Sequence, residues 1–124
     1  RRTIAQFHDR GIPVSLFIDP VKQQVDASRE IGSDMIEIHT GEYADARTQA
    51  GRARQLARIM RIARYAHSLG LTVNAGHGIN YVNIAEVRTL PHLHELNIGH
   101  SIVSRAVFTG VDEAVREMKT RMNG

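Results

Sequence analysis

Four short aliphatic segments alternate with helix-forming segments along this chain of 124 residues. The pattern predicts strands at 14–19, 35–40, 71–75 and 94–98, and helices at 1–11, 20–31, 50–69, 82–90 and 112–122. Gly11, Gly32 and Gly70 stand where helices are expected to end, and a short helical turn is expected after 99–101. Strands joined through helices in this order pair in parallel with right-handed crossovers. The chain is therefore predicted to be an α/β protein.

The predicted strands are apolar on one face only. Neighbouring residues of a strand point to opposite sides, so Ile36 and Ile38 share one face while Glu37 and His39 share the other. The strands of a doubly wound sheet are apolar on both faces, because helices cover both. Barrel strands pack helices outside and place polar groups inside and at their C-terminal ends. The one-sided pattern therefore favours a TIM (β/α)₈ barrel.

The length limits how much of such a barrel the chain supplies. A complete (β/α)₈ barrel needs about 250 residues, and this chain has 124. We therefore expect four βα units, with residues 1–124 forming the C-terminal half of a single barrel domain. The other four units are expected upstream.

Two predicted turns have the composition of phosphate-binding loops. The turns at 76–78 and 99–101 both contain glycine, and the second leads directly into a helix. Glycine lets a ligand approach the backbone, and the first N–H groups of a helix attract anions. Gly78, Gly99 and His100 are thus candidates for binding a phosphorylated small molecule. The alternative is that these glycines only form tight turns.

Two side chains near these turns are candidates for catalysis. His77 lies between two glycines, and histidine is the side chain that most often serves as a general acid or base. Glu37 is expected to face the barrel interior, where a carboxylate can stabilise developing positive charge. For both residues the alternative is a purely structural role. His39 and Asn97 are expected to complete a hydrogen-bonded layer.

Two other ligand classes are alternatives to a phosphorylated substrate. Glu37, His39, His77 and His100 would suit zinc, but they lack the short spacing of a zinc motif. The predicted helix at 50–69 carries five arginines without acidic residues, yet nucleic acid would also need a set of stacking aromatic residues. This helix is expected to be solvated or to form a subunit interface. No metal, cofactor or nucleic-acid partner is expected.

Composition and charge add three expectations. The chain has no cysteine, which favours an intracellular setting without disulfide bonds. No apolar run approaches the roughly 18 residues that cross a bilayer, so no membrane partner is expected. The net charge of +3 comes almost entirely from arginine, which suits phosphate or carboxylate ligands.

Four segments together resemble the pyridoxine 5′-phosphate synthase family. They are Ser-Leu-Phe-Ile-Asp at 15–19, Ile-Glu-Ile-His-Thr-Gly at 36–41, Val-Asn-Ala-Gly-His-Gly at 73–78 and His-Glu-Leu-Asn-Ile-Gly-His at 94–100. The resemblance implies a cytoplasmic TIM-barrel enzyme of vitamin B6 synthesis that forms octamers and needs no metal. Such an enzyme condenses 3-amino-2-oxopropyl phosphate with 1-deoxy-D-xylulose 5-phosphate, giving pyridoxine 5′-phosphate, phosphate and water.

The resemblance also implies roles for individual residues. His77 falls on the family's proton donor, Glu37 on the glutamate that stabilises the transition state, and Gly78 on a substrate-binding glycine. Gly99 and His100 fall on the pair that binds the phosphate of the amino-ketone. The family's N-terminal Asn-x-Asp-His strand, its substrate-binding arginines and its other catalytic histidine and glutamate have no counterpart in this chain. The fragment alone is therefore expected to be inactive.

Overall fold

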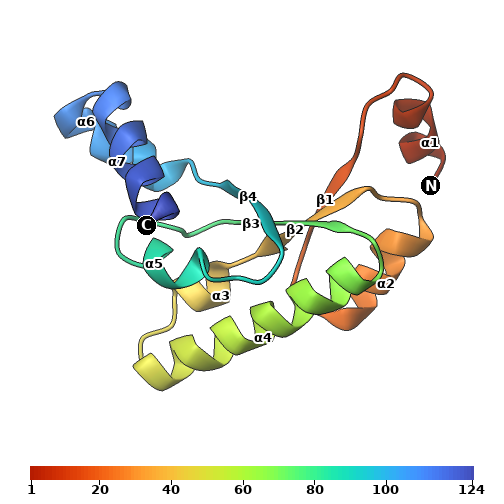
Figure 1. Ribbon diagram of the computed structural model, residues 1–124, viewed down its shortest axis with the longest axis horizontal. Helices are drawn as coiled ribbons and strands as arrows, with labels where there is room; N and C mark the ends of the chain where they lie inside the picture. Colours follow the sequence, from red (N-terminus) through yellow and green to blue (C-terminus); the bar gives the residue numbers. More distant parts are fainter.

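The computed structural model describes all residues of the chain, from Arg1 to Gly124, as a sequence of alternating helices and strands (Figure 1). The elements are α1 (Arg2–His8), β1 (Ser15–Ile18), α2 (Lys22–Glu30), β2 (Met35–His39), α3 (Gly41–Ala44), α4 (Gln49–Ser68), β3 (Thr72–Gly76), α5 (Ile84–Val87), β4 (Leu93–Asn97), α6 (His100–Thr109) and α7 (Val111–Asn123). All four predicted strands and all five predicted helices are present. The structure adds α3, extends the turn after Gly99 into a helix of ten residues, and shortens α5.

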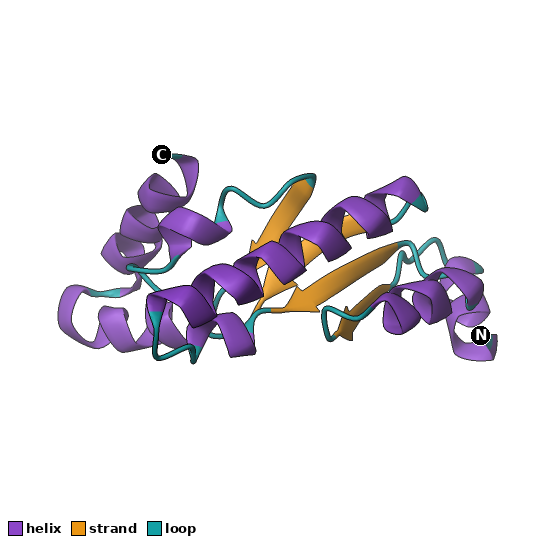
Figure 2. Cartoon of the chain, turned by 90° about the horizontal axis from the view of Figure 1, so that it is seen from below, coloured by secondary structure: helices purple, strands orange, loops and turns teal.

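The four strands form one parallel sheet in the order β1-β2-β3-β4. This sequential order is the one expected of consecutive βα units, and the predicted α/β class is confirmed. Figure 2 shows α4 running across one face of the sheet, with α2 beside it. In Figure 1 the opposite face of the central strands carries no helix. The sheet is therefore covered on one side only.

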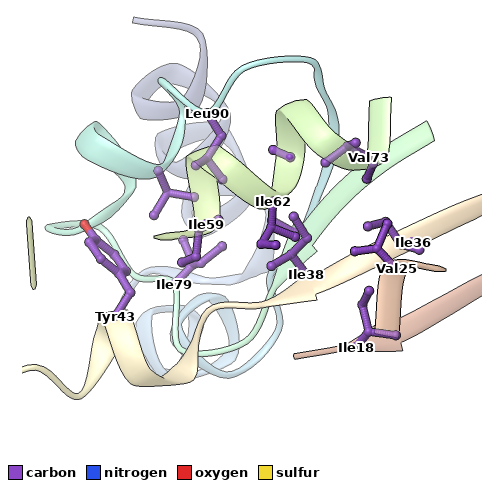
Figure 3. Close-up of a cluster of buried hydrophobic side chains, with 14 of the residues drawn as sticks. Ile18, Val25, Ile36, Ile38, Tyr43, Ile59, Ile62, Val73, Ile79 and Leu90 are labelled. Carbon is purple, nitrogen blue, oxygen red and sulfur yellow. The ribbon is translucent and has the colours of Figure 1, made fainter. Parts of the chain in front are cut away.

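The hydrophobic core lies between the covered face of the sheet and its helices (Figure 3). Ile36 and Ile38 of β2 are fully buried, and Ile59 and Ile62 of α4 are among the buried residues of the same cluster. On the uncovered face, Glu37 and His39 are half-buried, and the Phe17 side chain is 57% exposed. The predicted separation of aliphatic and polar faces is confirmed.

The helix α4 is fixed at both ends and along its length. The Thr48 hydroxyl accepts a hydrogen bond from the backbone N–H of Gly51 at 3.0 Å, which caps the N-terminus. Gly70 follows the last turn with a φ of +79°, a conformation that glycine adopts without steric cost. Arg58 donates to the Pro20 carbonyl at 3.1 Å and forms an ion pair with Glu42 at 2.9 Å. Arg58 therefore links α4 to the segments that contain Pro20 and Glu42.

The short helix α3 differs from the prediction, which placed no helix between the strand at 35–40 and the helix at 50–69. Its Tyr43 side chain is fully buried, and the Tyr43 hydroxyl lies 3.0 Å from both the Asn83 carbonyl and the Glu86 carboxylate. Burial, together with the bond to Glu86, raises the pKa of Tyr43 to about 12. This buried anchor holds α3 against α5 at the C-terminal end of the sheet.

No helix of the structure has both the length and the apolar character needed to cross a membrane.

We predict that the 124-residue chain associates with itself in solution. Both outer strands, β1 and β4, have an unpaired edge, and the buried Asn74 Oδ1 has no hydrogen-bond partner. Open parallel edges and exposed apolar side chains such as Phe17 favour association. The weight-average mass from sedimentation velocity should rise with concentration, and Phe17→Glu should weaken this rise. Val82→Glu, a matched change at an exposed apolar residue that lies outside the sheet and its open edges, should not. A monomer at every concentration would contradict the prediction.

Candidate active site

A cleft of about 740 Å³ opens at the C-terminal ends of β2, β3 and β4. All five residues singled out in the sequence line this cleft: Glu37, His77, Gly78, Gly99 and His100. Phe17, Asn80, Asn97 and Ser101 also contribute to its wall. The structure therefore brings the two candidate catalytic side chains and the two candidate phosphate-binding turns into one site.

Glu37 projects from the middle of β2 onto the uncovered face of the sheet. Its Oε2 accepts a hydrogen bond of 2.7 Å from the Asn97 side-chain amide at the end of β4. Glu37 is half-buried, so the carboxylate is reachable from the cleft. The expected hydrogen-bonded layer therefore includes Asn97. Its specific partner could not be predicted, because the bond joins residues 60 positions apart in the sequence.

His77 is presented to the cleft by an unusual turn. His77 has a φ of +80° and Gly78 a φ of +75°, so two successive residues are left-handed. This conformation costs a residue other than glycine about 1–2 kcal/mol, and such strain is concentrated at functional sites. The Thr40 hydroxyl, which is buried, donates hydrogen bonds to the carbonyl oxygens of Gly76 and His77. The Asn83 amide donates to the Gly78 carbonyl at 3.0 Å.

Gly78 is required by this turn for a second reason. A Cβ atom at position 78 would lie 2.5 Å from the Cβ of Ala44 in α3, closer than two carbon atoms can approach. The absence of a side chain therefore lets the turn pack on α3 while Gly78 lines the cleft. Tyr43 anchors α3 from below, so the buried tyrosine supports the position of His77.

His39 occupies the adjoining surface without lining the cleft. Its ring packs edge-on against Phe17, with centroids 5.1 Å apart, and lies 4.8 Å from the ring of His77. Asp19 Oδ1 is 3.6 Å from His39 Nδ1. Gly41 makes room for this arrangement, because a Cβ there would lie 2.7 Å from the His39 ring. His39 thus packs against the rings of both Phe17 and His77.

The second turn places a helix N-terminus at the opposite wall. Gly99 immediately precedes α6, and no side chain caps the first N–H groups of that helix. These groups have no partner within the helix and carry partial positive charge. The Ser101 hydroxyl donates to the Ile79 carbonyl at 2.7 Å and ties this turn to the segment that follows His77. The wall formed by Gly99, His100 and Ser101 can therefore bind an anion.

The two alternative ligand classes gain little from the geometry. The structure places no three His, Asp or Glu side chains as a set that could hold a metal ion, and His39 lies outside the cleft. On α4, Arg58 is occupied by Glu42 and Pro20, and the α4 arginines form no part of the cleft. The cleft combines the uncapped N-terminus of α6 with the side chains of Glu37 and His77.

We predict that inorganic phosphate binds at the α6 end of the cleft. In ¹H–¹⁵N spectra of the chain, phosphate should shift the backbone amides of Gly78, Gly99 and His100 with a common saturation curve. Chloride at equal ionic strength should leave these amide shifts unchanged, because a single chloride ion does not present the several oxygen acceptors of phosphate. Shifts confined to Arg54 and Arg61 would contradict this location.

Comparison with known proteins extends over the whole chain. The family model described as "Pyridoxal phosphate biosynthesis protein PdxJ" matches residues 1–124. Proteins named pyridoxine 5′-phosphate synthase from Opitutus terrae and Trichlorobacter lovleyi are 59% and 53% identical over 124 and 119 residues, which are 99% and 96% of this chain. The synthase of Idiomarina loihiensis is 53% identical over 111 residues, 90% of this chain.

The aligned regions cover 50% of the Opitutus and Trichlorobacter proteins and 46% of the Idiomarina protein. The chain therefore spans about half the length of these relatives. The cleft, with its two glycine turns, lies wholly within the matched residues. On this match, the chain belongs to the PdxJ family of pyridoxal phosphate biosynthesis proteins.

Proposed function

We propose that this chain is the C-terminal half of a pyridoxine 5′-phosphate synthase. The reaction condenses 3-amino-2-oxopropyl phosphate with 1-deoxy-D-xylulose 5-phosphate and gives pyridoxine 5′-phosphate, phosphate and water. The observation that carries the proposal is the single cleft in which Glu37, His77 and the α6 N-terminus meet, in a member of the PdxJ family. In this proposal Glu37 and His77 are catalytic, and Gly78, Gly99 and His100 bind substrate.

The two turns suit the phosphate group of the amino-ketone. A phosphate at the N-terminus of α6 would accept hydrogen bonds from N–H groups that have no other partner in the helix. Gly99 leaves that approach open, since a Cβ at position 99 would have no neighbour within 4 Å. The net positive charge of the chain also favours phosphorylated substrates.

The side chains suit the proton transfers of the condensation. When an amine condenses with a ketone, the carbonyl oxygen leaves as water and must first be protonated. The exposed His77 imidazole, as a general acid, can supply that proton. Loss of that water leaves a protonated imine, whose positive nitrogen the Glu37 carboxylate at the same cleft would stabilise.

The rest of the active site belongs, in this proposal, to a second half-barrel. The open edges of β1 and β4 would pair with its strands and close an eight-stranded barrel around the polar face. A closed interior would also offer a donor to the buried Asn74 Oδ1. The proposal includes the cytoplasmic octamer that the family resemblance implies, and it needs no metal.

Activity should depend on the missing half and on His77. The chain alone should form no pyridoxine 5′-phosphate. Co-expression with the half of the Opitutus terrae synthase that it does not match should restore some turnover. His77→Asn in that pair should lower kcat by about 10²–10⁴-fold, because the proton donor is lost. Glu37→Gln should lower kcat more than it raises KM, because the charge matters chiefly in the transition state.

The matched control is His94→Asn, an exposed histidine of β4 that does not line the cleft. This variant should keep the turnover of the parent pair. Turnover of the His77→Asn pair equal to that of His94→Asn would remove His77 from the mechanism. Turnover by the isolated chain would show that the second half is dispensable.

A further inference from the structure

The hydrogen bond between Asn97 and Glu37 spans an intervening strand. Asn97 ends β4, Glu37 lies in β2, and β3 runs between them. Neighbouring strands are about 4.8 Å apart, so strands two places apart are separated by roughly twice that distance. The two side chains nevertheless meet, with 2.7 Å between Asn97 Nδ2 and Glu37 Oε2. Such a contact requires that β3 leave the space between them free.

Gly76 of β3 leaves that space free. It is the register partner of Asn97, and a Cβ at this position would overlap Glu37 Oε1. The same atom would lie 2.9 Å from the Asn97 carbonyl oxygen and 3.2 Å from the Asn97 Cβ. Both partners therefore rest directly over Gly76. Any side chain at position 76 would therefore displace the Glu37 carboxylate.

This arrangement fixes the direction of the Glu37 carboxylate at two points. Asn97 holds Oε2 by a hydrogen bond, and Oε1 lies against the bare backbone of Gly76. An amide is a neutral donor, so it orients the carboxylate without cancelling its charge. A lysine or arginine in place of Asn97 would neutralise the negative charge of Glu37, which in the proposed function stabilises the substrate. The chemistry of the contact therefore matches a carboxylate kept for electrostatic stabilisation.

We propose that Asn97 is a positioning residue that holds the Glu37 carboxylate toward the cleft, and that Gly76 supplies the space this contact needs. The inference rests on the proposed role of Glu37. It adds a residue that acts through Glu37, and it explains why the chain has glycine at position 76, where the backbone φ is not left-handed. Glycine is required at position 76 because Glu37 and Asn97 approach its backbone closely, and not because the backbone is left-handed there.

The first test examines the contact itself in the 124-residue chain. In ¹H–¹⁵N spectra, the two side-chain amide protons of Asn97 should be widely separated, because one of them is bound to a carboxylate. Glu37→Ala and Gly76→Ala should each move them toward the values of a free amide. The Asn80 side-chain amide, in the same cleft, is the internal control and should stay in place. Asn97 amide shifts that Glu37→Ala leaves unchanged would overturn the proposal, whether or not Gly76→Ala folds.

The second test measures turnover in the pair formed with the unmatched half of the Opitutus terrae synthase. Asn97→Ala should lower kcat by about 10²-fold, the cost of a misplaced catalytic group, and leave KM for both substrates within about twofold. Asn97→Asp should be at least as damaging, since it removes the donor and adds a repelling charge. Asn123→Ala, the same change at the last residue of α7, is the control and should keep full turnover.

The two tests separate this inference from the proposed function. Wild-type turnover in Asn97→Ala would overturn the positioning role while leaving the synthase proposal intact. If the wild-type pair shows no turnover, the proposed function fails, and the amide shifts of Asn97 alone then decide whether this residue holds Glu37.

Discussion

The packing of the aliphatic face of β2 and β3 on α4 determines the position of every group in the cleft. Ile36, Ile38 and Val73 are buried on that face. Because side chains alternate along a strand, this burial sets Glu37 on the opposite face. A shift of one residue in register would bury the carboxylate and expose the isoleucines, at a high cost in free energy. The same alternation that builds the core therefore builds the candidate active site.

Hydrogen bonds of buried side chains hold the turns at these strand ends in a defined position. The buried Thr40 hydroxyl holds the turn that carries His77, and Tyr43 anchors α3 beneath Gly78. These bonds hold two left-handed residues in place, so the strain of the turn is balanced by buried hydrogen bonds. The loops that would carry the chemistry are thus supported by the rigid end of the sheet.

Sequence reasoning succeeded where the information was local. The alternation at 36–39 predicted which face Glu37 occupies, and the glycine turns predicted where Gly78 and Gly99 lie. It missed α3, because a helix of four residues has no periodicity, and its anchor Tyr43 depends on contacts about 40 residues away. The hydrogen bond from Asn97 to Glu37 could not be predicted either, because it also joins residues far apart in the sequence. It depends on the relative register of three strands and on the absence of a side chain at Gly76.

The central claim is that the cleft binds a phosphorylated substrate within a barrel completed by a second half. A crystal structure of the chain bound to the complementary half and to 3-amino-2-oxopropyl phosphate tests it most directly. The account predicts that the free edges of β1 and β4 pair with the added strands. It also predicts that the phosphate lies at the N-terminus of α6, with the amino-ketone between Glu37 and His77. A phosphate bound on the arginines of α4, or a β4 edge that stays unpaired, would contradict it.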